Sequence, residues 1–450
     1  MPKGMLALFD TGGVLDLNDE MKAASTRRTI TGTTSGDLEA VEADGLIHAR
    51  GIPYATASRF RRPEPVDTPG TTRDATRRGP ACIQLPSRLD NLTGPMIDTL
   101  DQSEDCLVLS VTAPAAAEGL PVMVWLHGGG YVSGGGEAEK YDADHLVREG
   151  VVVVSVTFRL GGFGYLTPKG SGDSNIGVQD QIAALRWVST NIARFGGDPT
   201  NVTLFGQSAG GDAILALMAC EAAEGLFNRA IVQSAPLGLR SGRSALYNTA
   251  RKAFAGRFPT DPDTAPASEV LDAERAVTAA VRRFGAAGGM PFGPVAHLEP
   301  LSGDPDAALR KTATRVELLI GHTRDDAAPF VDIVTNMLWL NRFGVVSSVL
   351  SAPVVRLVTS LLFGVDSMVK MWHRAGGRVA SYRVDWAPKG APLGACHCIE
   401  LPLLFGDAWS DAPMLAGHTP PKELAARVRR TWAAFARDGV AGLPARSLVF

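Results

Sequence analysis

The sequence predicts an α/β fold in which a mostly parallel central sheet is flanked by helices. The first observation is a pair of continuous apolar runs, Val122 to Leu126 and Val151 to Val154, which suit strands buried on both faces. The second is a β-branched run, Val202 to Phe205, that ends at Gly206 and leads into an Ala-rich apolar segment, Asp212 to Glu221. A strand followed directly by a helix is typical of parallel sheets.

The other elements follow in chain order. We expect short antiparallel strands over about 29–110, core strands at 122–126, 151–158, 202–205, 229–233 and 316–320, an amphipathic helix over 176–195 and a surface helix over 422–437. Residues 29–450 are expected to form a single domain, with cap-like insertions at about 240–312 and 330–375. Residues 1–28 are polar and mixed, and we expect them to be a mobile extension.

The strand-to-helix turn carries the pattern Gly206-x-Ser208-x-Gly210. A serine on so sharp a turn is held in a strained backbone conformation, so its neighbours must be glycine or very small. The turn exposes the hydroxyl at a helix N-terminus, where partial positive charge favours a developing anion. This geometry suits nucleophilic attack on a carbonyl. A glycine-rich turn that merely connects two elements is the alternative, because the chain contains 49 glycines.

A second motif follows the strand at 122–126 and reads His127-Gly128-Gly129-Gly130-Tyr131. Consecutive glycines after a buried strand let backbone N–H groups turn toward a ligand. Acyl transfer needs such donors for its tetrahedral oxyanion, and loss of one donor costs about 3–4 kcal/mol of transition-state stabilisation. The arrangement is typical of the oxyanion loop of α/β-hydrolase lipases and esterases, with a flexible glycine hinge as the alternative. His127 is expected to hold the loop rather than to transfer protons.

Longer motifs resemble the type B carboxylesterase and cholinesterase-like family of α/β-hydrolases. They are Arg50-Gly51-Ile52-Pro53-Tyr54-Ala55, Ser103-Glu104-Asp105-Cys106-Leu107, Arg159-Leu160-Gly161-Gly162-Phe163-Gly164, Asn175-Ile176-Gly177-x-x-Asp180-Gln181 and Asn191-Ile192-x-x-Phe195-Gly196-Gly197-Asp198-Pro199. The resemblance covers about residues 29–440. It implies an α/β-hydrolase fold with helical excursions over the active site, and a serine carboxylic ester hydrolase that acts through an acyl-enzyme.

The resemblance also implies a catalytic triad. Ser208 is the expected nucleophile, and His397, in Gly394-Ala395-Cys396-His397, is the expected general base. Asp326 stands after the strand at 316–320 where the family has Glu, which makes it the expected acid. Asp325 is a rival for that role, and a solvated acidic loop is the alternative for both residues.

Further roles are implied in the same way. The backbone N–H groups of Gly129, Gly130 and Ala209 would bind the oxyanion, and Ser234 would support the triad from behind. Gln207 replaces the Glu that often precedes the nucleophile in this family. One negative charge fewer beside the site argues against a preference for choline-like cations.

The five cysteines allow one disulfide and one metal alternative. Cys82 and Cys106 resemble a family disulfide near the active-site entrance, but the cytosol would keep the pair reduced. Cys396 and Cys398 flank His397, and a metal site would need more ligands than this trio. We therefore expect no metal and no organic cofactor.

Composition excludes several classes. A 45% hydrophobic, 20% charged chain with net charge −3 is typical of a globular protein, and it shows no basic face for nucleic acid.

No stretch reaches eighteen uninterrupted apolar residues, so we expect no membrane span. The stretch that comes closest, Met337 to Val365, fits helices over the active-site mouth. No export signal stands at the N-terminus, so we expect a cytoplasmic protein. The chain stops at Phe450, and we expect a closing strand of the sheet to be missing.

The sequence therefore predicts hydrolysis of short-to-medium neutral esters, with a small-molecule ester as the only expected partner. An inactive cholinesterase-like binding protein remains an alternative, although such relatives usually lose the serine or the histidine. Amide, carbamate or lactone hydrolysis by the same triad is another. The sequence leaves open the physiological substrate and the oligomeric state.

Overall fold

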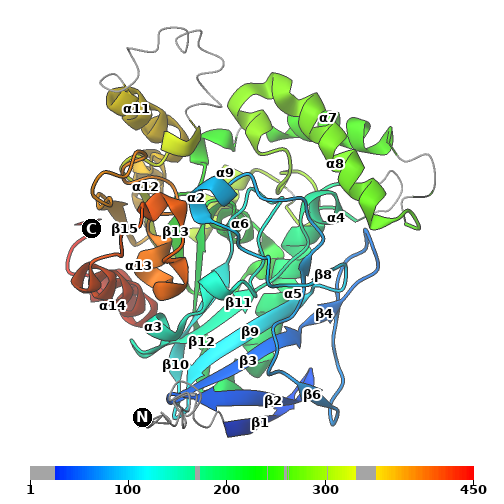
Figure 1. Cartoon of the computed structure of the whole chain (residues 1–450), viewed down its shortest axis with the longest axis vertical. Coiled ribbons are helices and arrows are strands. Elements are labelled where there is room, and N and C mark those ends of the chain that lie inside the picture. The colour runs from blue at the N-terminus through cyan, green and yellow to red at the C-terminus, as the bar shows by residue number, and fades with distance from the viewer. Residues whose placement is uncertain are drawn as a thin grey trace, which may run out of the picture.

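The computed structural model describes residues 26–167, 173–240, 242–257, 261, 263–301, 303–330 and 351–450. A long twisted sheet crosses the molecule, with helices packed along both of its faces (Figure 1). The strands of this sheet are β1 (Thr26–Thr33), β2 (Gly36–Ala43), β3 (Leu46–Pro53), β6 (Thr72–Asp74), β9 (Val108–Pro114), β10 (Leu120–Leu126), β11 (Val152–Val156), β12 (Gly197–Gln207), β13 (Arg229–Gln233), β14 (Glu317–Thr323), β15 (Val379–Val384) and β16 (Ser447–Val449). Two small separate sheets pair β4 (Ala55–Thr56) with β5 (Glu64–Pro65) and β7 (Ala81–Cys82) with β8 (Gln102–Ser103).

The order of strands in the large sheet is β1-β2-β3-β9-β11-β10-β12-β13-β14-β15-β16, with β6 beside β2. Pairings from β11 to β16 are all parallel, whereas those from β1 to β11 are antiparallel. The fold is therefore the expected α/β-hydrolase architecture, with a mostly parallel sheet behind an antiparallel N-terminal part. Because parallel strands end at one edge, residues that follow β10, β12, β14 and β15 are brought to the same side of the molecule.

The α-helices are distributed along the whole chain. They are α2 (Asp90–Thr93), α3 (Asp144–Val147), α4 (Gly161–Tyr165), α5 (Ile176–Asn191), α6 (Ala209–Met218), α7 (Arg243–Ala255), α8 (Ala267–Val281), α9 (Pro305–Thr312), α11 (Ser351–Phe363), α12 (Asp366–Arg374), α13 (Leu401–Phe405) and α14 (Lys422–Asp438). Short 3₁₀ turns join several of them, including η2 (Ile192–Phe195), which extends α5, and η6 (Ala328–Phe330) after β14.

Strand β10 shows why both faces of the sheet are covered. Its alternate side chains enter two different cores, Val122, Val124 and Leu126 one core and Met123 and Trp125 the other. The first core is completed by α5 and α6, and the second by α3, α13 and α14. A strand buried on both faces must be apolar throughout, which explains the uninterrupted apolar run in the sequence.

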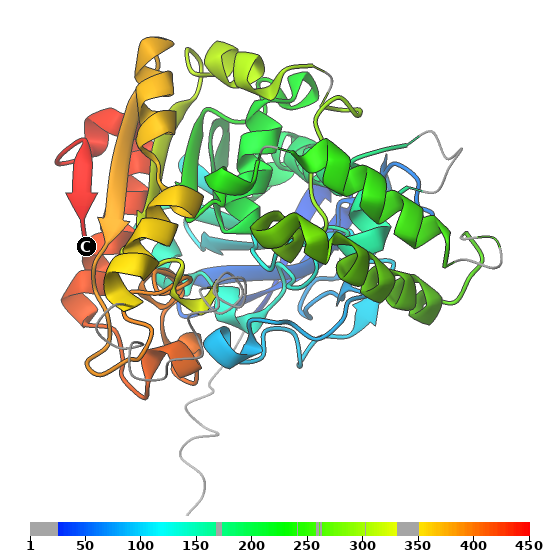
Figure 2. The ribbon, with the colours of Figure 1, turned by 90° about the horizontal axis from the view of Figure 1, so that it is seen from above.

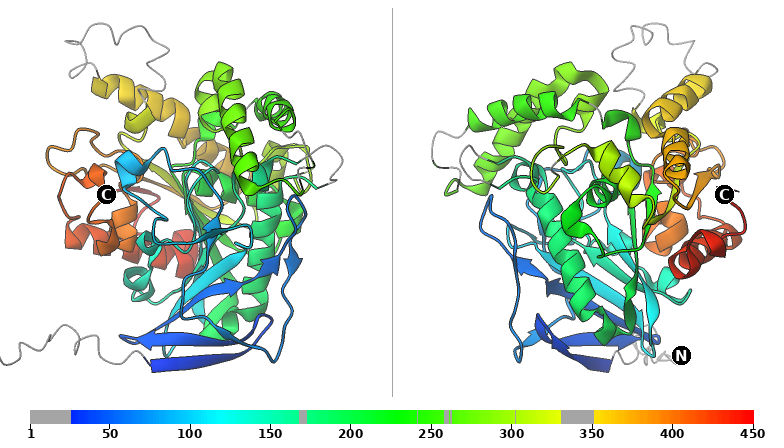
Figure 3. Two further views of the ribbon diagram at one scale, coloured as in Figure 1. Left: turned by 45° about the vertical axis from the view of Figure 1, so that its right-hand side comes forward. Right: turned by 180° about the vertical axis from the view of Figure 1, so that it is seen from behind.

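Helices α7, α8 and α11 stand on the side of the molecule away from β1 and β2, as two further orientations show (Figures 2 and 3). They lie within the two ranges that the sequence analysis assigned to cap-like insertions. Of the apolar stretch at 337–365, only residues from 351 on are described; the rest lies outside the described residues.

The segment Ala352–Arg374 is the one candidate, within the described ranges, that is long and apolar enough to cross a membrane, with a mean hydropathy of 1.5. It consists of two helices, α11 with 13 residues and α12 with 9 residues. Each is shorter than the roughly 20 residues that a span requires. A single candidate of this kind is weak evidence for a span.

The predicted core strands are confirmed with small changes at their ends, and the predicted helix over 176–195 is α5 followed by η2. The helix expected from Asp212 starts three residues earlier, at Ala209. The expected loss of a closing strand is wrong, because β16 pairs in parallel with β15. The extension expected to reach residue 28 ends sooner, since β1 begins at Thr26 and Thr26 to Arg28 pair with β2; residues 1–25 lie outside the described residues.

Candidate active site

Ser208 occupies the turn between β12 and α6 with φ 58° and ψ −121°, a backbone conformation that non-glycine residues rarely adopt. Two backbone hydrogen bonds hold this conformation. The Ser208 N–H donates to the Gln233 carbonyl at 2.8 Å, and the Ser208 carbonyl accepts from the Asp212 N–H at 3.0 Å. The first bond ties the turn to β13 and the second begins α6, so sheet and helix together enforce the strain.

The glycines beside Ser208 are required by close packing against β10. A β-carbon on Gly206 would lie 2.7 Å from the Leu126 carbonyl oxygen, and one on Gly210 would lie 2.0 Å from the same atom. Both distances are far below van der Waals contact. The pattern around Ser208 is thus a steric consequence of bringing the turn against the end of the neighbouring strand.

The glycine loop after β10 lies against the same cavity as Ser208. Gly129 and Gly130 have φ of 110° and 64°, and both line this cavity. A β-carbon on Gly129 would lie 1.9 Å from the Ser133 carbonyl oxygen, so the tight loop needs glycine there. Ala209 is the first residue of α6 and contributes its N–H at the helix N-terminus, where such groups have no partner within the helix. The structure thus places all three expected oxyanion donors on the segments that border Ser208.

His127, at the start of the loop, is buried and stacks on Phe158 with ring centroids 4.5 Å apart. Its Nδ1 lies 2.8 Å from the Gly128 carbonyl oxygen. Burial lowers the pKa of His127 to about 4, although the hydrogen bond to Gly128 opposes this. A neutral, packed imidazole fits the expected role of holding the loop.

Asp326 and His397 form a hydrogen-bonded pair between Asp326 Oδ1 and His397 Nδ1, and both side chains are fully buried. The other carboxylate oxygen, Asp326 Oδ2, accepts from the Thr323 N–H at 2.9 Å. Burial raises the pKa of Asp326, but the imidazole of His397 and the Ser234 hydroxyl outweigh it and hold that pKa below its ordinary value. The carboxylate is therefore ionised and oriented toward the imidazole.

The remaining imidazole nitrogen, His397 Nε2, lies 3.1 Å from the Gln207 side-chain nitrogen. With Nδ1–H donated to Asp326, Nε2 carries the lone pair and accepts from the amide. The aromatic rings of Phe330 and Phe363 pack on the imidazole at centroid distances of 5.1 and 5.3 Å, and both rings line the cavity that contains Ser208. The structure thus connects the imidazole to the serine's cavity through these two rings; His397 is not itself among the described residues that line the cavity, and its Nε2 is paired with Gln207 rather than with Ser208.

Behind this pair, the Ser234 hydroxyl donates to Glu400 Oε1 at 3.2 Å, while Glu400 Oε2 is buried without a partner among the described residues. Burial, followed by the charge of Asp326, raises the pKa of Glu400 to about 7. Ser234 was expected near the triad, whereas no role was predicted for Glu400. The motif after His397 offered a signal, because an acid three residues beyond a buried histidine lies close to it.

Glu400 should make stability depend on pH. A carboxyl whose pKa is raised from 4.5 to about 7 on folding keeps a proton that the unfolded chain releases, so its contribution is full below pH 4.5 and is lost as pH rises to about 7. We expect Glu400→Gln, which cannot ionise, to lose less stability than the wild type between about pH 5 and about pH 8 in urea unfolding. Glu423→Gln, on the exposed side of α14, is the matched control. Parallel pH profiles for the wild type and Glu400→Gln would contradict this assignment.

Asp325 is neither the partner of His397 nor part of a solvated loop. It is 8% exposed, lies 2.8 Å from Arg324 Nη2 and 3.6 Å from Arg356 Nε, and accepts from the Ala395 N–H at 3.0 Å. Its own N–H donates to the Ala395 carbonyl at 2.9 Å. Asp325 therefore anchors the loop two residues before His397, which contradicts the alternative of a solvated acidic loop.

The sequence left open whether Cys82 and Cys106 form a disulfide. In the structure both are buried free thiols in hydrogen-bonding proximity. Cys396 and Cys398 are also buried and free, and burial raises the pKa of both thiols. Across the described ranges, no group of three or more His, Cys, Asp or Glu side chains is arranged to hold a metal ion.

The cavity at Ser208 has a volume of about 160 Å³. Its described walls come from the glycine loop, the segment at 87–89, η4 (Leu237–Leu239), η5 (Arg282–Gly289), η6 and α11. Sequence reasoning missed Arg88, Met290, Phe330 and Phe363 as wall residues, since each lies in a loop, a turn or a helix end without a motif.

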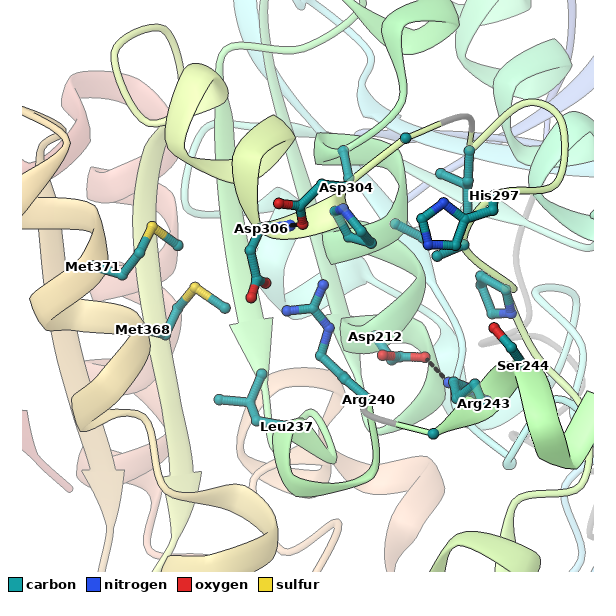
Figure 4. Close-up of a pocket in the computed structure, with 18 of the residues that line it drawn as sticks. Asp212, Leu237, Arg240, Arg243, Ser244, His297, Asp304, Asp306, Met368 and Met371 are labelled. Atoms are coloured by element: carbon teal, nitrogen blue, oxygen red, sulfur yellow. Dashed lines mark hydrogen bonds and ion pairs between the residues drawn. The ribbon is translucent and has the colours of Figure 1, made fainter.

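A larger cavity of about 690 Å³ lies beyond α6 and does not include Ser208 among its described lining residues (Figure 4). Its walls carry both carboxylates and guanidinium groups, and Asp212 is paired there with Arg243 at 2.8 Å. Volume does not identify a site; the smaller cavity has Ser208, two of the expected oxyanion donors and the two rings that pack on His397 among its described walls. The smaller cavity is therefore the candidate active site.

A serine on a strained strand-to-helix turn, facing a glycine loop and backed by a buried His–Asp pair, defines the class of serine hydrolases with the α/β-hydrolase fold. The Carboxylesterase family profile matches residues 23–342. The chain belongs to the carboxylesterase family and is a carboxylesterase-type serine hydrolase.

Relatives with related activities cover nearly the whole chain. The probable N-octanoylanthranilate hydrolase of Rhodococcus erythropolis is 39% identical over 93% of this chain and 94% of its own length. The para-nitrobenzyl esterase of Bacillus subtilis is 33% identical over 92% and 90%. The solved structure of a thermophilic pNB esterase has a TM-score of 0.76 and 32% identity, covering 92% of both chains.

Proposed function

We propose that the chain hydrolyses carboxylic esters of short-to-medium acyl length through an acyl-enzyme on Ser208. The observation that carries this proposal is the shared cavity, in which Ser208 meets the glycine loop on one side and the two phenyl rings that pack on His397 on the other. A nucleophile, a base and oxyanion donors at one cavity are the minimal requirement for acyl transfer.

The proposed sequence of steps uses only residues of this chain. Ser208 Oγ attacks the ester carbonyl carbon while His397 Nε2, after exchanging its hydrogen bond from Gln207 for one from Ser208 Oγ, accepts the proton, and Asp326 stabilises the imidazolium that forms. The N–H groups of Gly129, Gly130 and Ala209 stabilise the tetrahedral oxyanion. The alcohol departs with the proton from His397, and water then repeats the steps on the acyl-enzyme.

The walls of the cavity support small acyl groups. The cavity volume of about 160 Å³ is well below the roughly 300–1,000 Å³ of sites for drug-sized ligands. Leu89, Met290, Leu362 and Phe363 are among its apolar walls, which can pack against an alkyl chain.

Amide hydrolysis by the same triad is the second candidate. The relative with 39% identity carries an amide substrate in its name, N-octanoylanthranilate. The machinery described above does not separate esters from amides, since attack on the carbonyl is common to both. The leaving group, rather than the nucleophile, distinguishes them.

A series of p-nitrophenyl esters from acetate to palmitate tests the proposal. We expect kcat/KM to peak between about four and eight acyl carbons and to fall for longer chains, because the cavity at Ser208 is small. Release of nitrophenolate is measured by absorbance, with octanoyl p-nitroanilide, which releases p-nitroaniline, as the amide counterpart. A maximum at palmitate would contradict the size argument, and absence of hydrolysis for every ester and for the anilide would contradict the proposed function.

A further inference from the structure

The active-site cavity contains one charged side chain among its described lining residues, that of Arg88. The other described walls are apolar or glycine and serine, including Val132, Met290 and Phe330. A guanidinium group in such surroundings has no evident role in the acyl transfer itself. The position of Arg88 and the lack of a carboxylate partner for it among the described residues together indicate which chemical group it binds.

Arg88 is directed toward the oxyanion loop. Its Nη2 donates to the Gly289 carbonyl oxygen at 2.7 Å. The same nitrogen lies 3.8 Å from the position of a β-carbon on Gly130, one of the three proposed oxyanion donors. The positive charge therefore stands at the edge of the reacting centre, within reach of a group attached to the substrate near its carbonyl.

No carboxylate in the described part of the chain forms an ion pair with Arg88. Arg159 and Arg243, which are less exposed than Arg88, do have such partners: Arg159 pairs with Asp180, and Arg243 pairs with Asp212 at 2.8 Å. Arg88 is an exposed residue, so its guanidinium keeps contact with water, and without a counter-charge among the described residues it is available to pair with an anion that enters the cavity.

We propose that Arg88 selects substrates that carry a carboxylate close to the scissile bond. The inference rests on the proposed esterase function and adds a substrate class to it: esters, or amides, with one free carboxylate. The guanidinium plane offers two parallel N–H donors to a carboxylate, a geometry that a lysine ammonium cannot reproduce. The carboxylate can belong to the acyl group or to the leaving group, and the two cases are separated by experiment.

Two substrate pairs make the test. For the leaving-group side, 2-carboxyphenyl butyrate is compared with phenyl butyrate; for the acyl side, phenyl hydrogen glutarate is compared with phenyl hexanoate. We expect Arg88→Met to lower kcat/KM for the carboxylate member of one pair by about 10-fold or more, because a hydrogen-bonded ion pair is worth roughly 1.5–3 kcal/mol. The neutral member of each pair should change less than about twofold, since it does not use the charge.

Arg77→Met is the matched control, because it removes the same charge from a side chain that is 88% exposed and outside the cavity. Arg88→Lys keeps the charge without the planar donors, so it should recover part of the selectivity. Thermal unfolding of each variant establishes that it is folded. Because each value is a ratio between variants on one substrate, intrinsic differences in ester reactivity cancel.

A selective loss for either carboxylate substrate supports the inference and identifies its side. Equal losses on charged and neutral members, or the same loss in Arg77→Met, would overturn it. Failure of the proposed function is a separate result: the wild type would then hydrolyse neither phenyl butyrate nor phenyl hexanoate.

Discussion

Replacing Ser208 with alanine is expected to abolish the acyl-enzyme and to lower kcat by several orders of magnitude. Loss of the nucleophile in a comparable serine hydrolase costs about 10⁶ in kcat, because the triad acts as a unit. The strained turn that presents Ser208 is held by backbone hydrogen bonds to Gln233 and from Asp212, so alanine should leave the fold intact. The measurement is the burst and steady state of p-nitrophenyl butyrate hydrolysis.

The matched control is Ser244→Ala, since Ser244 lines the larger, separate cavity. It should retain wild-type kcat. Labelling with a fluorophosphonate, followed by peptide mass spectrometry, should place the adduct on the peptide that contains Ser208 and on no other serine. An adduct on a different serine would show that the nucleophile has been assigned wrongly.

Asp326→Asn is expected to reduce kcat by about 10⁴ while the protein stays folded, as loss of the acid does in a serine protease. The carboxylate holds the Nδ1–H of His397 and stabilises the imidazolium that forms during attack. An asparagine can present its amide nitrogen instead, which favours the wrong tautomer. Steady-state kinetics with p-nitrophenyl butyrate measure the loss, and circular dichroism establishes that the variant is folded.

Asp325→Asn is the control for Asp326→Asn, because it changes the same functional group one residue earlier in the chain. The asparagine side chain in this variant would keep an oxygen for the Ala395 N–H but lose the charge that faces Arg324 and Arg356. We therefore expect kcat to fall less than about 10-fold, together with a lower melting temperature, because the penalty falls mainly on loop anchoring. If Asp325→Asn lost more activity than Asp326→Asn, the roles of the two carboxylates would have to be exchanged.

Ser208 could be predicted from the sequence because its geometry is local. Strand, turn and helix lie within a single short stretch. The turn leaves no room for a β-carbon at positions 206 and 210, so the glycines there indicate the turn in the sequence. The glycine loop after β10 is local in the same sense. Steric limits on the backbone act over a few residues, so the sequence of each of these two motifs is sufficient to predict its local structure.

Which of the two carboxylates, Asp325 or Asp326, pairs with His397 depends on contacts between segments far apart in the chain. The two residues are adjacent, of one type, and both buried. Asp326 is hydrogen-bonded to an imidazole 71 residues away, whereas Asp325 is hydrogen-bonded to Ala395 and paired with two arginines. The position of the family motif in the sequence favoured Asp326 as the triad acid. The partners of Asp325 and Asp326, however, depend on how the loop after β14 packs on the loop before His397.

The α/β class, most core strands and the nucleophilic turn could be predicted from the amino-acid sequence, since apolar runs and glycine spacing follow from burial on two faces and from local steric limits. The folded chain was needed to see that the C-terminal residues close the sheet as β16, that Cys82 and Cys106 are free thiols, and that Arg88 lies beside Gly289, 201 residues away. Each of these depends on packing between segments far apart in the chain. Long-range packing sets which side chains lose water and which charges lack a partner, and no short window of sequence encodes that.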